Sequence, residues 1–221
     1  INLSTGKCDW NKYHYYVHSL DIQNNILYAT GYNKITVRNL STNTNISCPF
    51  SGNLSSMSRW GYSNAVDPSG SNLYIYNYRY LYRFAIGTNK CPSTSYASRI
   101  HNSRWYYSFG MRFHPTDDSI LYATSYYEHR LYKLTLNSAK SGFSSKSYVG
   151  RCCRGNSTSS NVRMYYPRSI AIDSTNSRIA VADYYKNSLQ FFNFNLEFIK
   201  EIGGSSGTRM SGAHEAIKAI V

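Results

Sequence analysis

The stretch Ile120-Leu-Tyr-Ala-Thr-Ser, at residues 120–125, recurs in altered form at three other places in the chain. Its counterparts are Ile26-Leu-Tyr-Ala-Thr-Gly, Asn72-Leu-Tyr-Ile-Tyr-Asn and Arg178-Ile-Ala-Val-Ala-Asp. Each copy is rich in β-branched and aromatic residues and lies between polar turns, which predicts a strand flanked by two further strands. Measured at their second residues, successive copies are 46, 48 and 58 residues apart. A β-rich repeat of this length predicts the blades of a β-propeller.

The sequence therefore predicts an all-β fold, a β-propeller built of four-stranded antiparallel blades, with about four blades and the start of a fifth. The units cover approximately residues 13–52, 55–99, 101–150 and 156–204, and 205–221 begins a further unit. Propellers close with roughly four to eight blades, and an open blade edge leaves strand groups unpaired. Because the chain also begins without Met, we expect it to be a portion of a longer protein.

The fourth unit resembles an NHL repeat. The resemblance is carried by Tyr166-Pro-Arg-Ser-Ile-Ala-Ile-Asp, by Ile179-Ala-Val-Ala-Asp and by the closing Gly203-Gly204. The other units match loosely, because Gly31, Asn77 and Ser125 replace the acid at Asp183. Their Leu-Tyr-Ala-Thr cores also resemble propellers of the Tyr-Trp-Thr-Asp type. Both resemblances imply a propeller, usually of six blades, and some intracellular NHL domains bind RNA through a basic face.

The composition is rich in tyrosine and poor in acids. There are 23 Tyr, and 24 Lys and Arg stand against 11 Asp and Glu, which gives a formal net charge of +13. Such a chain attracts polyanions, although without a basic run the attraction is not specific. No apolar run approaches the roughly 20 residues that cross a membrane, so we expect no membrane insertion.

Cysteines and sequons favour an extracellular glycoprotein. The disulfide candidates are Cys8, Cys48, Cys91, Cys152 and Cys153. An odd number leaves one free or paired outside the chain, and the adjacent pair is hard to join to itself. The glycosylation candidates are Asn2, Asn39, Asn45, Asn53 and Asn156. Five sequons are close to what the composition gives by chance, so secretion rests mainly on the Ser-, Asn- and Tyr-rich composition.

No catalytic, metal or cofactor site is predicted. None of the six histidines lies in a known catalytic frame, and no zinc-ligand spacing appears. Asp21, Asp67 and Asp173 recur at the ends of predicted inner strands, with His114 in the same place in the third unit. Because Asp accepts hydrogen bonds from turn backbone, we interpret these residues as turn caps rather than metal ligands.

Aromatic residues recur beside basic ones at two places in each unit, after the second strand and before the first. In an antiparallel blade these two loops open on the same face, so we predict a recognition surface at one mouth of the propeller. Its predicted residues are Tyr32, Tyr78, Tyr126, Tyr184, Trp60, Trp105, Arg79, Arg130 and Lys186, with Arg168 among further basic residues nearby. The alternative is that these rings pack between adjacent blades.

A face of Tyr, Trp and Arg favours binding over catalysis, because these residues dominate interaction hot spots. We expect a binding or scaffolding propeller that recognises a protein or glycan within a larger assembly. The first alternative is single-stranded RNA, whose bases stack on rings and whose phosphates pair with cations. The second alternative is a metal-dependent propeller hydrolase or lyase.

Overall fold

The computed structural model describes residues 17–31, 34–48, 61–77, 80–94, 96, 98–101, 108, 110–152 and 157–204. Eighteen strands lie in this part of the chain, and sixteen of them form four sheets of four strands. Blade 1 contains β1 (Val17–Gln23), β2 (Ile26–Gly31), β3 (Lys34–Asn39) and β4 (Thr44–Ile46). Blade 2 contains β5 (Gly61–Val66), β6 (Asn72–Asn77), β7 (Tyr80–Ala85) and β8 (Ser98–His101).

Blades 3 and 4 follow the same plan. Blade 3 contains β9 (Met111–Phe113), β10 (Ile120–Ser125), β11 (Arg130–Leu136) and β12 (Phe143–Val149). Blade 4 contains β15 (Pro167–Asp173), β16 (Arg178–Asp183), β17 (Ser188–Asn193) and β18 (Phe198–Gly203). Between them, β13 (Arg151–Cys152) and β14 (Arg163–Met164) form a short parallel pair.

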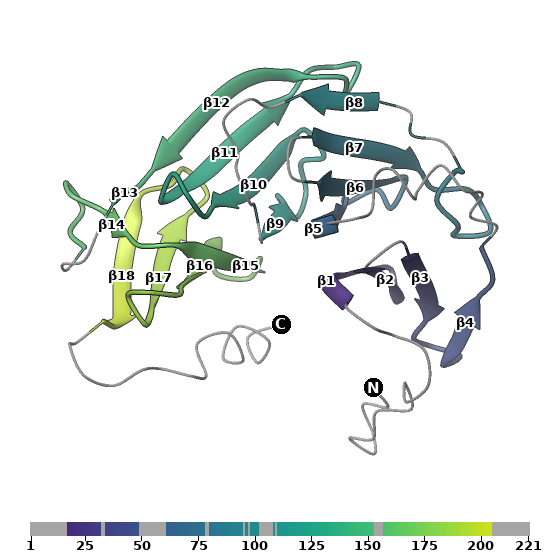
Figure 1. Ribbon diagram of the computed structural model, residues 1–221, viewed down its shortest axis with the longest axis horizontal. Coiled ribbons are helices and arrows are strands. Elements are labelled where there is room, and N and C mark those ends of the chain that lie inside the picture. Colours follow the sequence, from purple (N-terminus) through teal and green to yellow (C-terminus); the bar gives the residue numbers. More distant parts are fainter. Residues whose placement is uncertain are drawn as a thin grey trace.

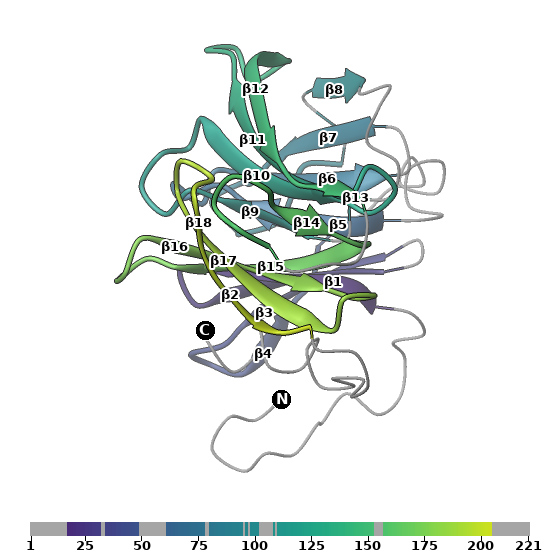
Figure 2. The same cartoon turned by 90° about the vertical axis from the view of Figure 1, so that its left-hand side faces the viewer.

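The four sheets follow one another in chain order around a common centre, with β1, β5, β9 and β15 innermost (Figure 1). Every pair of neighbouring strands within a blade is antiparallel, and a view from the side shows the blades stacked face to face (Figure 2). The predicted all-β propeller of four-stranded antiparallel blades is confirmed. The described residues contain no helix, and therefore none that could cross a membrane.

A tyrosine on the second strand of blades 1, 2 and 3 joins each blade to the next. The Tyr28 hydroxyl donates to the Lys90 carbonyl at 3.2 Å, and the Tyr122 hydroxyl donates to the Phe194 carbonyl at 2.9 Å. The Tyr74 ring packs against Phe113 with ring centroids 4.9 Å apart. The three tyrosines are at most 2% exposed. Tyrosines of the second strands therefore pack between neighbouring blades.

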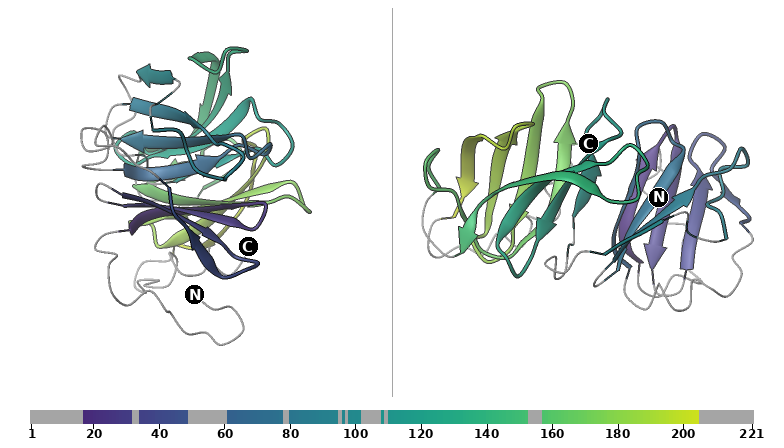
Figure 3. Two further views of the ribbon diagram at one scale, coloured as in Figure 1. Left: turned by 90° about the vertical axis from the view of Figure 1, so that its right-hand side faces the viewer. Right: turned by 90° about the horizontal axis from the view of Figure 1, so that it is seen from above.

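The inner strand of blade 1 has an open face. Leu20 and Ile22 are 41% and 54% exposed. The residues in the same register in blade 3, Met111 and Phe113, pack against blade 2 and are 0% and 6% exposed. Within the described part of the chain, no blade covers this face of β1, and a view from above shows blade 4 on the left and blade 1 on the right (Figure 3).

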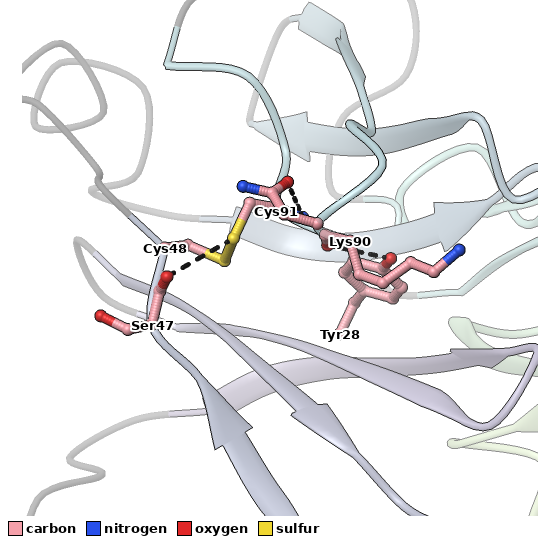
Figure 4. The surroundings of a disulfide bond; sticks show 6 residues. Tyr28, Ser47, Cys48, Lys90 and Cys91 are labelled. Carbon is pink, nitrogen blue, oxygen red and sulfur yellow. Dashed lines mark hydrogen bonds between the residues drawn. A yellow bond between two sulfur atoms is a disulfide. The ribbon is translucent and has the colours of Figure 1, made fainter.

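A disulfide joins the first two blades. Cys48, just after β4, is bonded to Cys91 in the turn between β7 and β8. The Tyr28 ring lies beside it, with its hydroxyl on the carbonyl of Lys90 (Figure 4). Cys152 is also disulfide-bonded, while Cys8 and Cys153 lie outside the described residues. The prediction of disulfides is thus confirmed for Cys48 and Cys91.

Two of the three repeated aspartates cap turns as predicted. The Asp67 carboxylate accepts from the backbone N–H groups of Ser71 and Asn72, and the Asp173 carboxylate accepts from Asn176. His114 has the same place in blade 3, where its Nδ1 lies 3.4 Å from the N–H of Thr116.

Asp21 does not cap a turn, and that prediction is wrong. The pairing of Ile22 with Leu27 places Gln23, not Asp21, in register with Asp67. The Asp21 carboxylate instead accepts from the N–H of Val66 in blade 2 at 2.7 Å. Arg112 of blade 3 lies 3.6 Å away, so Asp21 ties three inner strands together.

Candidate functional site

The predicted recognition residues divide into described and undescribed ones. Tyr126, Tyr184, Arg130 and Lys186 belong to blades 3 and 4 and are described. The other five lie outside the described residues: Tyr32, Tyr78, Trp60, Trp105 and Arg79. The site is therefore built here from blades 3 and 4.

The strand register brings the two predicted loops to one end of each blade. In blade 4 the first residue of β15, Pro167, pairs with the last residue of β16, Asp183. The loop before the inner strand then meets the turn after the second strand, and the N–H groups of Tyr184 and Tyr185 donate to the carbonyls of Tyr166 and Tyr165. Blades 1 and 2 have the same pairing, Val17 with Gly31 and Gly61 with Asn77.

Six tyrosines from three loops form one continuous cluster at this end, which we call the tyrosine cluster. Its members are Tyr126, Tyr127, Tyr165, Tyr166, Tyr184 and Tyr185. Tyr166 lies at the centre, with its ring centroid 4.4 Å from Tyr126, 4.7 Å from Tyr165 and 4.9 Å from Tyr185. Tyr126 contacts Tyr166, which contacts Tyr185, and Tyr185 contacts Tyr184.

The cluster is a surface feature rather than a buried core. Tyr127, Tyr184 and Tyr185 are 52%, 50% and 44% exposed. Burial and the surrounding tyrosine hydroxyls raise the pKa of Tyr166, so its phenol stays neutral at physiological pH. The cluster thus offers phenol hydroxyls together with ring faces.

The side chains of Asp183 and His129 hold the backbone of the cluster in place. The Asp183 carboxylate, wholly buried, accepts from the N–H groups of Tyr165 at 2.6 Å and Lys186 at 3.1 Å. The N–H of Tyr166 donates to Nδ1 of His129 at 3.1 Å, and burial lowers the pKa of this histidine. A ring whose Nδ1 accepts must be unprotonated there, so the lowered pKa and the hydrogen bond agree.

A β-bulge places Arg168 in the cluster. The register of β15 against β16 shifts between Pro167 and Ser169, so Arg168 is the extra residue. Its guanidinium carbon lies 3.9 Å from the ring centroid of Tyr184 and 5.5 Å from that of Tyr126. Bulges re-aim side chains next to functional sites, and the same shift occurs at the start of β1 and β5. Sequence composition gives no signal for a bulge, so this role of Arg168 was not predicted.

Lys186 does not belong to the exposed face, contrary to the prediction. Its side chain is 3% exposed, and its Nζ lies 2.6 Å from a carboxylate oxygen of Glu201. The ammonium also donates to Ser157 and to the carbonyl of Arg163. The lysine therefore holds blade 4 together, because a buried ammonium is tolerated only when it is paired.

The contacts that Arg130 makes among the described residues lie within blade 3 and not with the tyrosines of the cluster. Its guanidinium lies 4.0 Å from the ring centroid of Tyr148 and 3.9 Å from Glu128. It hydrogen-bonds to Tyr132 at 3.3 Å.

Among the described residues, no group of three His, Cys, Asp or Glu side chains could hold a metal ion.

No protein-family model matches the chain, and no curated protein matches it. Several solved structures do match it, propeller domains among them. One is a functionally unknown protein from Desulfotomaculum acetoxidans, with a TM-score of 0.61 at 15% identity over 87% of this chain and 57% of its own. Another is the Cps50 (Swd1) β-propeller domain of Myceliophteria thermophila, with a TM-score of 0.58 at 10% identity over 89% of this chain and 58% of its own.

A third similar structure is apo AztD from Citrobacter koseri, with a TM-score of 0.51 at 12% identity over 85% of this chain and 47% of its own. The chain spans about half of the length of these proteins. At such low identities the likeness supports the propeller fold alone, and the NHL assignment stays a prediction.

Proposed function

We propose that the chain is a non-catalytic binding and scaffolding propeller of an extracellular glycoprotein, and that the tyrosine cluster recognises a protein or glycan partner. One observation carries the proposal: six tyrosines from three loops converge on one face, and Tyr127 and Tyr184 are half exposed there. Loops held by a rigid sheet scaffold are where such folds place binding residues.

The pairing of the nearby cations favours this function over RNA binding. Lys186 is buried against Glu201, and Arg130 is engaged with Glu128 and Tyr148. An RNA-binding face would need these charges for phosphates.

Two features support an extracellular glycoprotein that extends beyond this chain. The Cys48–Cys91 disulfide fits an oxidising compartment. Among the described sequons, the Asn45 side chain is exposed, although its Oδ1 accepts from the Arg38 guanidinium at 3.2 Å, and the Asn39 oxygen caps the turn at Ser41. We therefore propose Asn45 as a glycosylated residue. The open face of β1 supports a longer protein or assembly.

A photo-crosslinking amino acid tests the proposal even while the partner is unidentified. It replaces Tyr127, and in a control it replaces Tyr96, which is 44% exposed in blade 2 outside the cluster. We expect the Tyr127 variant, in native secretions, to capture a discrete protein or glycoconjugate that the Tyr96 variant does not. Equal capture by both variants, or none, would contradict the proposed site.

A further inference from the structure

The chemistry of the tyrosine cluster narrows the class of its ligand. Every exposed ring in it carries a hydroxyl, because all six members are tyrosines. The exposed aliphatic side chains of the described residues lie elsewhere, on β1 at Val17, Leu20 and Ile22 and on β18 at Ile199 and Ile202. The apolar surface of the cluster is therefore made of phenol rings, without aliphatic side chains.

The cluster is also close to neutral, despite the net charge of +13 of the chain. Glu201 balances Lys186, and Glu128 lies beside Arg130. The Arg168 guanidinium is stacked on the rings of Tyr184 and Tyr126. A ligand that depended on many phosphates, sulfates or carboxylates would find few cations here for charge-assisted hydrogen bonds.

The rings are held in place before any ligand arrives. Tyr184 and Tyr185 donate backbone hydrogen bonds to Tyr166 and Tyr165, and Asp183 holds the N–H of Tyr165. A preorganised platform loses little conformational entropy on binding. This saving in conformational entropy matters most for the affinity of small ligands, because they bury little surface area on binding.

We infer that the tyrosine cluster binds a neutral oligosaccharide, an inference that rests on the proposed function and specifies its ligand. A pyranose ring has an apolar C–H face that packs on an aromatic ring, and hydroxyls at its edge that exchange hydrogen bonds with phenols. Tyr127, Tyr184 and Tyr185 offer both kinds of contact. A linear oligosaccharide would lie across their rings, with no charge required on either side.

Binding of the full chain to immobilised oligosaccharides tests this inference. The probes are neutral cello-, chito- and manno-oligosaccharides, with heparin as the polyanionic comparison. We expect binding to at least one neutral series, with a dissociation constant that is nearly unchanged by added salt. Tyr184→Ala and Tyr185→Ala should each weaken it about tenfold or more, whereas Tyr96→Ala should not, and all variants should keep the thermal unfolding midpoint of the parent.

Three results would overturn the inference. They are binding to heparin alone with a steep loss at higher salt, equal weakening by Tyr96→Ala, and binding to no neutral oligosaccharide. If the last occurs while photo-crosslinking at Tyr127 captures a protein, the ligand class is wrong and the proposed binding site stands. If neither experiment finds a ligand, both proposals fail.

Discussion

Two sets of tyrosines in this protein differ in position within the repeat and in what they do. Tyr28, Tyr74 and Tyr122 lie on second strands, are buried, and join one blade to the next. Four tyrosines of the cluster lie in the turns after the second strands, at Tyr126, Tyr127, Tyr184 and Tyr185, and about half of the Tyr127 and Tyr184 surface remains exposed there. The same residue type thus builds the core and the candidate binding surface, and its place relative to the strand end decides which.

The largest expected effect is the loss of stability when one of the buried second-strand tyrosines, which we call the core set (Tyr28, Tyr74 and Tyr122), is replaced. Tyr122→Ala should lower the free energy of unfolding by about 3–5 kcal/mol, because it removes a buried ring and leaves a cavity between blades 3 and 4. Denaturant unfolding measures this. A loss below about 1 kcal/mol would show that the ring is not part of the blade interface.

Hydroxyl deletion separates two members of the core set. Tyr122→Phe should cost about 1–3 kcal/mol, because the carbonyl of Phe194 loses its donor. Tyr74→Phe should be neutral or stabilising, because the buried Tyr74 hydroxyl has no hydrogen-bond partner among the described residues. Equal losses in the two variants would contradict this difference.

The Cys48–Cys91 disulfide should add to the free energy of unfolding by an amount similar to that of the Tyr122 side chain. Its cysteines are 43 residues apart, and a double Cys48→Ser, Cys91→Ser variant should lose about 2–4 kcal/mol of stability. The reduced parent protein sets the upper bound of this loss, because reduction opens the Cys48–Cys91 bond and the disulfide of Cys152 together. An unchanged unfolding midpoint in the variant would argue that the bond does not constrain blades 1 and 2.

The contribution of Asp183, whose carboxyl holds the N–H of Tyr165 in the cluster, to folding stability should depend on pH. Burial raises the pKa of Asp183 to about 7, although the N–H groups of Tyr165 and Lys186 oppose the shift. A carboxyl whose pKa is higher in the folded than in the unfolded state binds its proton more tightly when folded. Its contribution to stability is then present below about pH 4 and is lost as pH rises through about 7.

Asp183→Asn tests this, because the asparagine cannot ionise. The difference in unfolding free energy between parent and variant should change in favour of the variant as pH rises from about 4 to about 7. The difference cancels the other titrating groups, such as His129, whose lowered pKa acts in the opposite direction. A pH-independent difference would show that Asp183 titrates in its ordinary range.

The repeat could be recognised in the sequence because each unit alternates strand and turn residues in the same order, and this order predicted the blades and the shared end of the two loops. Alignment by residue type failed where the register differed by two residues, as at Asp21. The burial of Lys186 depends on Glu201, which lies on a different strand, and on Ser157, which precedes the blade. Contacts of that kind, like the bulge at Arg168, are set by three-dimensional packing and leave no local pattern.

The smallest expected effect on stability comes from replacing one of the exposed turn tyrosines, Tyr127, Tyr184 or Tyr185. Tyr184→Ala should change the unfolding free energy by less than about 1 kcal/mol, because half of the ring is already in water. Its contact with the Arg168 guanidinium accounts for part of that change. A loss as large as that of Tyr122→Ala would place Tyr184 in the core and contradict the assignment of the cluster.

Nitration of the native chain, followed by peptide mass mapping, tests the division between the two sets most directly. The reagent reacts with tyrosine rings that solvent can reach. We predict early nitration of Tyr127, Tyr184 and Tyr185, and protection of Tyr74 and Tyr122 until the protein unfolds. Protection of the turn tyrosines in the native chain, or reaction of the strand tyrosines at a similar rate, would contradict the account.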